Sequence, residues 1–224
     1  MEKAKRNQEE MSATLLNLLT TAFIPLSPEE QLVSVQLYRL LAEGEPVSPE
    51  QIAQTLTLSN DAIKGILKEW SGVYYDEDNR MIEYWGLALP ETVHRFFVNG
   101  RTLYTWCALD SLFTPQILQK TADVESTCPV TGDPIRLTVT PNGIECFSPS
   151  GAVMSLVAPE ANKIREDVIT SFCHYVYFFS SAEAGSKWVK ENEGTYLLSI
   201  DEAYALGRKI SEARWYKETL FRIL

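Results

Sequence analysis

Residues 103–113 read Leu-Tyr-Thr-Trp-Cys-Ala-Leu-Asp-Ser-Leu-Phe. This stretch predicts an apolar helix that carries a thiol and an acid. Cys107 and Asp110 are three residues apart, a spacing that places two side chains next to each other on one helical face. A soft nucleophile would then lie beside a proton donor. The simpler alternative is an inert buried cysteine near a surface carboxylate, and Cys-x-x-Asp alone does not separate the two.

The residues around this stretch predict an antiparallel sheet. Asn99-Gly100 is a strong hairpin signal, and it joins two expected strands at 94–98 and 101–104. Pro115 is expected to bend or end the helix. Further on, β-branched residues alternate between Gly, Pro and Asn, which is typical of an antiparallel meander. Its expected strands are 122–126, 135–140, 143–148 and 152–156.

The C-terminal part of the chain alternates between helical and strand patterns. A helix is expected at 162–170, and the aromatic run at 171–180, which contains Cys173, predicts a buried strand. A helix at 182–191, a strand at 196–200 and an amphipathic helix from 201 towards 220 complete the pattern.

The N-terminal part is mainly helical. Apolar spacing and Ser-Pro starts predict helices at 11–23, 28–44, 49–56 and 61–70, followed by a hairpin of 73–75 and 81–85. This order is typical of a winged helix, which often binds DNA. However, residues 1–90 contain seven Lys plus Arg against fourteen Asp plus Glu, so a basic surface is missing. We therefore predict a structural winged-helix-like domain at 1–90 and a second, catalytic domain at 91–224. The fold class is α+β, with a mainly antiparallel sheet and flanking helices.

Composition limits the partners and the compartment. The chain has 224 residues and a formal net charge of -10, which opposes binding to nucleic acid or to an anionic membrane. A signal peptide and a transmembrane run are not expected, so we predict a cytoplasmic protein. In that reducing compartment the four cysteines are free, metal-binding or catalytic. They form no Cys-x-x-Cys pair, and a zinc ribbon is poorly supported.

Two free thiols and one carboxyl group can perform chemistry on a soft metal. Thiolates are preferred ligands of soft ions, so Cys107 and Cys173 can hold such an ion from two sides. The absence of a third or fourth ligand favours a two- or three-coordinate metal over tetrahedral zinc. Asp110 can act as a general acid if an apolar setting raises its pKa.

Three linked motifs resemble the bacterial organomercurial lyase (alkylmercury lyase) family. They are Leu-Tyr-Thr-Trp-Cys-Ala-Leu-Asp at 103–110, Ser-Thr-Cys-Pro-Val-Thr-Gly at 126–132 and Ser-Phe-Cys-His-Tyr-Val-Tyr-Phe-Phe at 171–179. The resemblance implies that Cys107, Cys173 and Asp110 are catalytic and contact the mercury of substrate and product. The two cysteines would bind the metal as thiolates, and Asp110 would deliver the proton to carbon. It implies a structural role for Cys128. One departure is His174, where some members have a second cysteine. Cys146 has no role to transfer, and a bystander thiol is expected.

The resemblance also implies a reaction and its partners. Protonolysis of R-Hg would give R-H and Hg(II), without an organic cofactor, and small thiols and a mercuric reductase would receive the metal. Trp106 and Phe172 are expected to shape an apolar pocket. Two alternatives remain at this point: a winged-helix, thiol-based metal-sensing transcriptional regulator, and a metal carrier that cleaves nothing. A regulator needs a basic recognition helix, and a carrier has no use for a proton donor such as Asp110.

Overall fold

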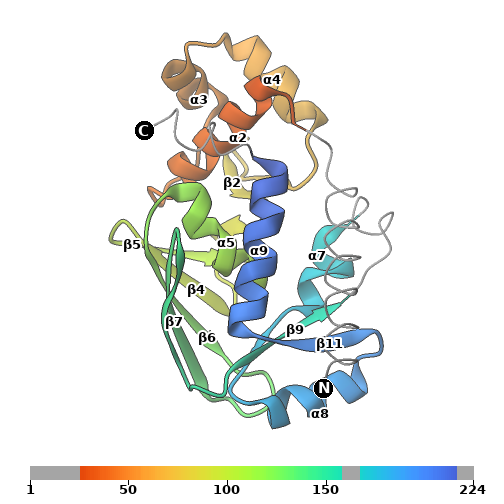
Figure 1. Cartoon of the computed structure of the whole chain (residues 1–224). Coiled ribbons are helices and arrows are strands. Elements are labelled where there is room, and N and C mark those ends of the chain that lie inside the picture. The colour runs from red at the N-terminus through yellow and green to blue at the C-terminus, as the bar shows by residue number, and fades with distance from the viewer. Residues whose placement is uncertain (1–25, 158–166, 216–224) are drawn as a thin grey trace.

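The computed structural model of the chain describes residues 26–157 and 167–215. The helix predicted at 11–23 lies outside these residues, as do the first part of the helix predicted at 162–170 and the end of the last helix. The described chain is an α+β structure in which helices flank a large antiparallel sheet (Figure 1). None of its helices combines the length and the apolar character that crossing a bilayer requires.

Three helices gather at one end of the molecule (Figure 1). They are α2 (Pro28–Leu41), α3 (Pro49–Leu56) and α4 (Asn60–Glu69). Ser27 and Ser48 each cap a helix in a capping box with a proline at its start, which confirms the predicted Ser-Pro starts. The hairpin of β1 (Val73–Tyr75) and β2 (Met81–Tyr84) follows, as predicted.

The large sheet has eight strands in the order β1-β2-β3-β5-β4-β6-β7-β8. Its remaining strands are β3 (Leu87–Ala88), β4 (His94–Val98), β5 (Arg101–Thr105), β6 (Ala122–Thr127), β7 (Pro134–Thr140) and β8 (Gly143–Ser148). The two-residue strand β3 was not predicted. It pairs with β2 on one side and β5 on the other, so one sheet continues past residue 90. The winged-helix interpretation and the division at residue 90 stay predictions.

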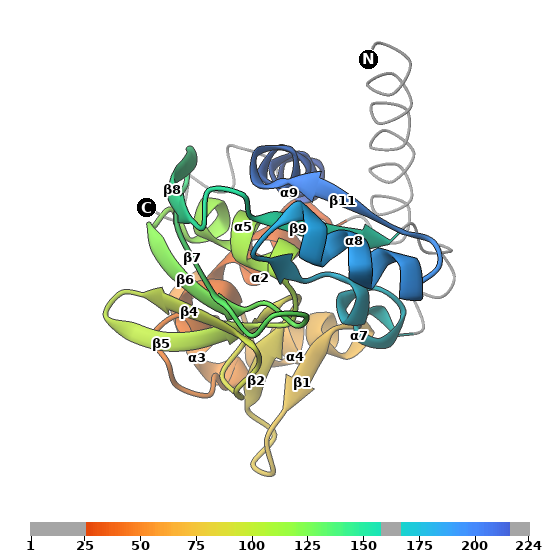
Figure 2. The same ribbon diagram turned by 90° about the horizontal axis from the view of Figure 1, so that it is seen from below.

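A second sheet of three strands lies beside the first, in the order β10-β9-β11. Its strands are β9 (Val153–Val157), β10 (Phe178–Phe179) and β11 (Thr195–Ser199). The prediction that the strand at 152–156 belongs to the meander is therefore wrong, because β9 pairs with β10 and β11 and not with β8. Helix α8 (Ala182–Glu191) packs against this small sheet (Figure 2).

Two helices occupy the centre of the molecule, α5 (Ala108–Leu118) and α9 (Ile200–Arg214) (Figure 1). They approach closely at Gly207, where a Cβ atom would lie 3.4 Å from the side chains of Leu109 and Phe113. Every residue of α5 is buried. The helix does not end at Pro115 but continues to Leu118, because packing on all sides outweighs the loss of one backbone hydrogen bond. The alternative that Pro115 bends the helix stays a prediction.

Candidate functional site

Cys107 lies at the N-terminus of α5 and not within the helix. The predicted strand at 101–104 is confirmed as β5, which pairs with β4 across the Asn99-Gly100 turn. The helix predicted over 103–113 therefore begins only at Ala108. Cys107 has an extended backbone and is the N-cap residue of α5. Asp110 is the third residue of the helix, and its Oδ2 atom accepts a hydrogen bond from the Cys107 backbone amide at 2.9 Å. Helix capping, and not a shared helical face, brings the thiol and the acid together.

Cys173 reaches the same place from a distant part of the chain. The predicted strand at 171–180 is interrupted: α7 (Val168–Ser171) leads into a short 3-10 turn, η1 (Cys173–Tyr175), and only Phe178 and Phe179 form a strand. The turn closes when the Val176 amide donates to the Cys173 carbonyl oxygen at 3.1 Å. This local hydrogen bond replaces the strand pairing that the aromatic pattern predicted.

Two sets of hydrogen bonds fix this turn against the rest of the site. The Ser155 hydroxyl of β9 donates to the Tyr175 carbonyl oxygen at 2.8 Å and accepts from the Tyr177 amide at 3.0 Å. The Ala108 amide, at the start of α5, donates to the Val176 carbonyl oxygen at 3.1 Å. The segments that carry Cys107 and Cys173 are therefore connected directly.

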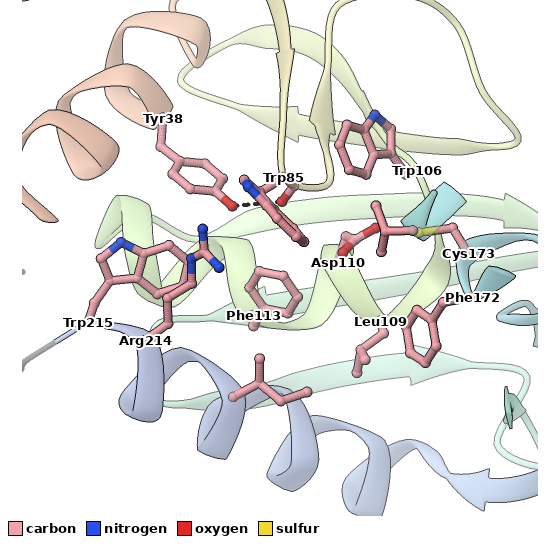
Figure 3. A pocket seen from close by; sticks show the side chains of 12 residues that line it. Tyr38, Trp85, Trp106, Leu109, Asp110, Phe113, Phe172, Cys173, Arg214 and Trp215 are labelled. Atoms are coloured by element: carbon pink, nitrogen blue, oxygen red, sulfur yellow. Dashed lines mark hydrogen bonds between the residues drawn. The ribbon is translucent and has the colours of Figure 1, made fainter. Parts of the chain in front are cut away.

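The three predicted site residues form one buried group. The thiol sulfurs of Cys107 and Cys173 and a carboxylate oxygen of Asp110 all lie within 4.8 Å of one another. Each side chain is at most 8% exposed. Figure 3 shows the carboxyl group of Asp110 beside the sulfur of Cys173. Two soft ligands and one carboxyl group at this separation can contact one mercury atom together.

Burial controls the protonation of this group. It raises the pKa of Asp110 from 3.8 to about 7, although hydrogen bonds from Cys107 act in the opposite direction. Burial, the hydrogen bond with Cys173 and the Asp110 charge raise the pKa of Cys107 well above its ordinary value. For Cys173, the hydrogen bond from Cys107 lowers the pKa, but burial and nearby carboxylates outweigh it and raise it overall. The three groups therefore favour their protonated forms, and a bound metal can displace the thiol protons.

An apolar cavity of about 40 Å³ opens beside Asp110 and Cys173 (Figure 3). Trp106 and Phe172 line it, which confirms the expectation that they shape an apolar pocket. Five further lining residues come from the N-terminal region and from the C-terminal end of the described chain, and no sequence pattern indicated them. They are Tyr38, Trp85, Ile210, Arg214 and Trp215. Their spacing to the motifs is too long for any local pattern to reveal.

The other two cysteines and His174 lie outside the group. Cys128 is buried in the turn after β6, where its backbone amide donates to the Asp133 carbonyl oxygen at 2.9 Å. Cys146 is exposed on β8. His174 follows Cys173 within η1 and is exposed. None of the three belongs to the buried group of ligand atoms.

Comparisons with known proteins identify relatives of this chain. A family model described as alkylmercury lyase, MerB, matches residues 87–212. The chain is 42% identical over 177 residues to an alkylmercury lyase of Streptomyces lividans, covering 79% of this chain and 80% of that protein. It is 40% identical to alkylmercury lyases of Bacillus cereus, over 77% of both chains, and of Pseudomonas putida, over 82% and 85%.

A solved structure shares the fold. It is described as the mercury-bound form of MerB2, and it aligns with a TM-score of 0.71 over 92% of this chain and 98% of its own, at 21% identity. The relatives named here are lyases and not transcription regulators, so the regulator alternative is not favoured.

Proposed function

Because the chain belongs to the alkylmercury lyase family, whose members are enzymes that act on the carbon-mercury bond, we propose that it cleaves R-Hg by protonolysis at Cys107, Asp110 and Cys173. The observation that carries this proposal is the buried group of two sulfurs and one carboxylate oxygen within 4.8 Å of one another. Mercury is the substrate and product of this reaction, and the proposal needs no further cofactor.

The first steps attach mercury to the two thiols. The Cys107 thiol loses its proton and displaces the anion X from R-Hg-X, so that HX leaves. The Cys173 thiol then adds to mercury and passes its proton to the Asp110 carboxylate. Two sulfur ligands push electron density onto mercury and onto the attached carbon, which becomes more basic. The raised thiol pKa values mean that mercury, and not the protein, supplies the driving force for losing both protons.

The last chemical step uses Asp110 as the acid. Its carboxyl group donates the proton to carbon, the carbon-mercury bond breaks, and R-H leaves with Hg(II) held by Cys107 and Cys173. A pKa of about 7 suits this role, because such a group both accepts and donates a proton near neutral pH. Small thiols then exchange with the two cysteines, and we expect a mercuric reductase to receive the metal. This exchange requires reduced thiols, so we place it in the cytoplasm. With a net charge of -10, we expect neither nucleic acid nor a membrane as a partner.

The direct test is release of the protonated organic group. Purified protein is incubated with methylmercury and excess small thiol, and methane is measured by gas chromatography. Asp110→Asn keeps both sulfurs and can still accept the Cys107 amide hydrogen bond, so it should bind mercury normally. Its methane release should fall by at least about 100-fold, the lower range for losing a general acid. Normal methane release by Asp110→Asn would contradict the role assigned to Asp110.

A further inference from the structure

The turn between β2 and β3 is formed by two residues with left-handed backbone. Trp85 has φ 37° and Gly86 has φ 98°. A positive φ is costly for a bulky residue such as tryptophan, and such strain persists only where the surroundings hold it in place. This turn belongs to the N-terminal part of the chain and lies outside the three motifs.

Contacts from four different parts of the chain hold the turn in this conformation. The Tyr38 hydroxyl of α2 donates to the Trp85 carbonyl oxygen at 2.7 Å, the bond drawn in Figure 3. The Trp85 amide donates to the Gly72 carbonyl oxygen at 3.0 Å, and the Trp106 amide donates to the Gly86 carbonyl oxygen at 2.9 Å. The guanidinium of Arg214 lies over the Trp85 ring at 4.5 Å.

Gly86 lies directly against the carboxyl group of Asp110. A Cβ atom on Gly86 would lie 2.4 Å from Cγ, 2.5 Å from Oδ1 and 2.8 Å from Cβ of Asp110. These separations are too short for any side chain to exist at residue 86 without displacing the acid. Only bare backbone fits at this position.

We propose that Gly86 is a positioning residue: the strained Trp85-Gly86 turn places bare backbone against the Asp110 carboxyl group and holds it toward the sulfurs of Cys107 and Cys173. The catalytic importance of this contact rests on the proposed function, whereas the contact between Gly86 and Asp110 is a feature of the structure alone. One side of the carboxyl group is fixed by the Cys107 amide and the other by the turn.

The main test compares Gly86→Ala with Gly100→Ala. Both glycines have a positive φ, but a Cβ on Gly100 would meet nothing within 4 Å, so Gly100→Ala reproduces the backbone strain without touching Asp110. Gly86→Ala should slow methane release in a single turnover by about 100-fold, the scale of a misplaced catalytic group. Mercuric ion binding should stay unchanged in both variants, because both sulfurs remain. Equal rates in Gly86→Ala and wild type, or an equal loss in Gly100→Ala, would overturn the proposal.

A second readout does not depend on turnover. The Cys107 backbone amide donates to Asp110 Oδ2 at 2.9 Å, so the NMR chemical shift of this amide proton reports the position of the acid. The shift should change in Gly86→Ala, because the acid is displaced, and it should stay at the wild-type value in Gly100→Ala. If the wild-type protein releases no methane, the proposed function fails, and this amide shift still tests the positioning role. An unchanged Cys107 amide shift in Gly86→Ala would overturn it.

A milder pair of variants covers the case in which Gly86→Ala does not fold. Tyr38→Phe removes the hydroxyl that holds the Trp85 carbonyl, whereas Tyr84→Phe removes a hydroxyl that donates to Ser34 at 2.9 Å. Both rings are fully buried and they contact each other edge to face. Tyr38→Phe should slow methane release roughly fivefold, the equivalent of one net hydrogen bond, and Tyr84→Phe should not. The same rate in both variants would contradict the positioning role of the turn.

Discussion

Two buried cysteine environments in this molecule have opposite effects on the thiol. At the site, Cys107 and Cys173 lie among apolar side chains and beside a carboxyl group, and the pKa of each thiol is raised. In the turn after β6, burial also raises the pKa of Cys128, but hydrogen bonds from Thr131 and from nearby backbone amides outweigh it and lower the pKa overall. Burial alone therefore does not determine the state of a thiol. The hydrogen-bond donors around the sulfur determine whether its pKa is raised or lowered.

The two cysteine environments suit different roles. The site keeps its thiols protonated until a soft metal replaces the protons, which suits a reaction that needs a proton later. In the turn between β6 and β7, Thr131 and nearby backbone amides favour the deprotonated form of the Cys128 thiol.

The largest effect should follow from removing a site sulfur. Cys173→Ser replaces a soft ligand by a hard one, so turnover should fall by at least about 1000-fold, as when a nucleophile is lost. Cys128→Ser should change methane release by less than a few-fold, because its sulfur lies outside the group that holds mercury. The exposed Cys146→Ser is the matched control for loss of a thiol. A greater loss in Cys128→Ser than in Cys173→Ser would reverse the comparison.

Local signals were enough to predict most of the fold. Ser27 and Ser48 predicted helix starts, and Asn99-Gly100 predicted the β4-β5 hairpin, because caps and tight turns depend on neighbouring residues. The wrong predictions concern segments whose structure depends on contacts with residues far away in the sequence. Pro115 stays within α5 because the helix is packed on all sides, and β9 leaves the meander because β10 and β11 offer it partners.

The site was predictable to a different extent. The motifs around Cys107 and Cys173 predicted the sulfurs and Asp110, and the structure brings these three together. The sequence did not reveal Tyr38, Trp85 or Arg214, because long-range packing places them in the cavity. The only sequence feature that pointed to this part of the cavity was Gly86, since a glycine can mark a turn whose backbone approaches another group closely.

The next effect concerns pH. The pKa of Asp110 is raised from 3.8 to about 7 in the folded protein, so between these values the folded state holds a proton that the unfolded state has lost. The wild-type free energy of unfolding should therefore fall, relative to Asp110→Asn, by roughly 1.4 kcal/mol for each pH unit from about pH 4 to pH 7. Urea unfolding of both proteins at several pH values measures this difference.

The control for pH is His94, which titrates in the opposite sense. Burial lowers its pKa from 6.5 to about 3, so it makes the folded state more stable as pH rises through this range. Both proteins contain His94, and its contribution cancels in the difference between them. A difference that does not grow with pH would show that the Asp110 pKa is close to its ordinary value, and the contrast between a dry site and a donor-rich turn would lose its main support.

The smallest effect should come from the turn itself. Cys128→Ala removes an acceptor for Thr131 and for nearby backbone amides, but these donors lie in exposed residues that can bond to water. The free energy of unfolding should therefore fall by only about 1 kcal/mol, the net value of a typical hydrogen bond. Cys128→Ser restores an acceptor at the same position, so it should recover part of this loss. Cys146→Ala should cost little, because that side chain is exposed. If Cys128→Ala and Cys128→Ser were equally unstable, volume and not hydrogen bonding would explain why this cysteine is buried.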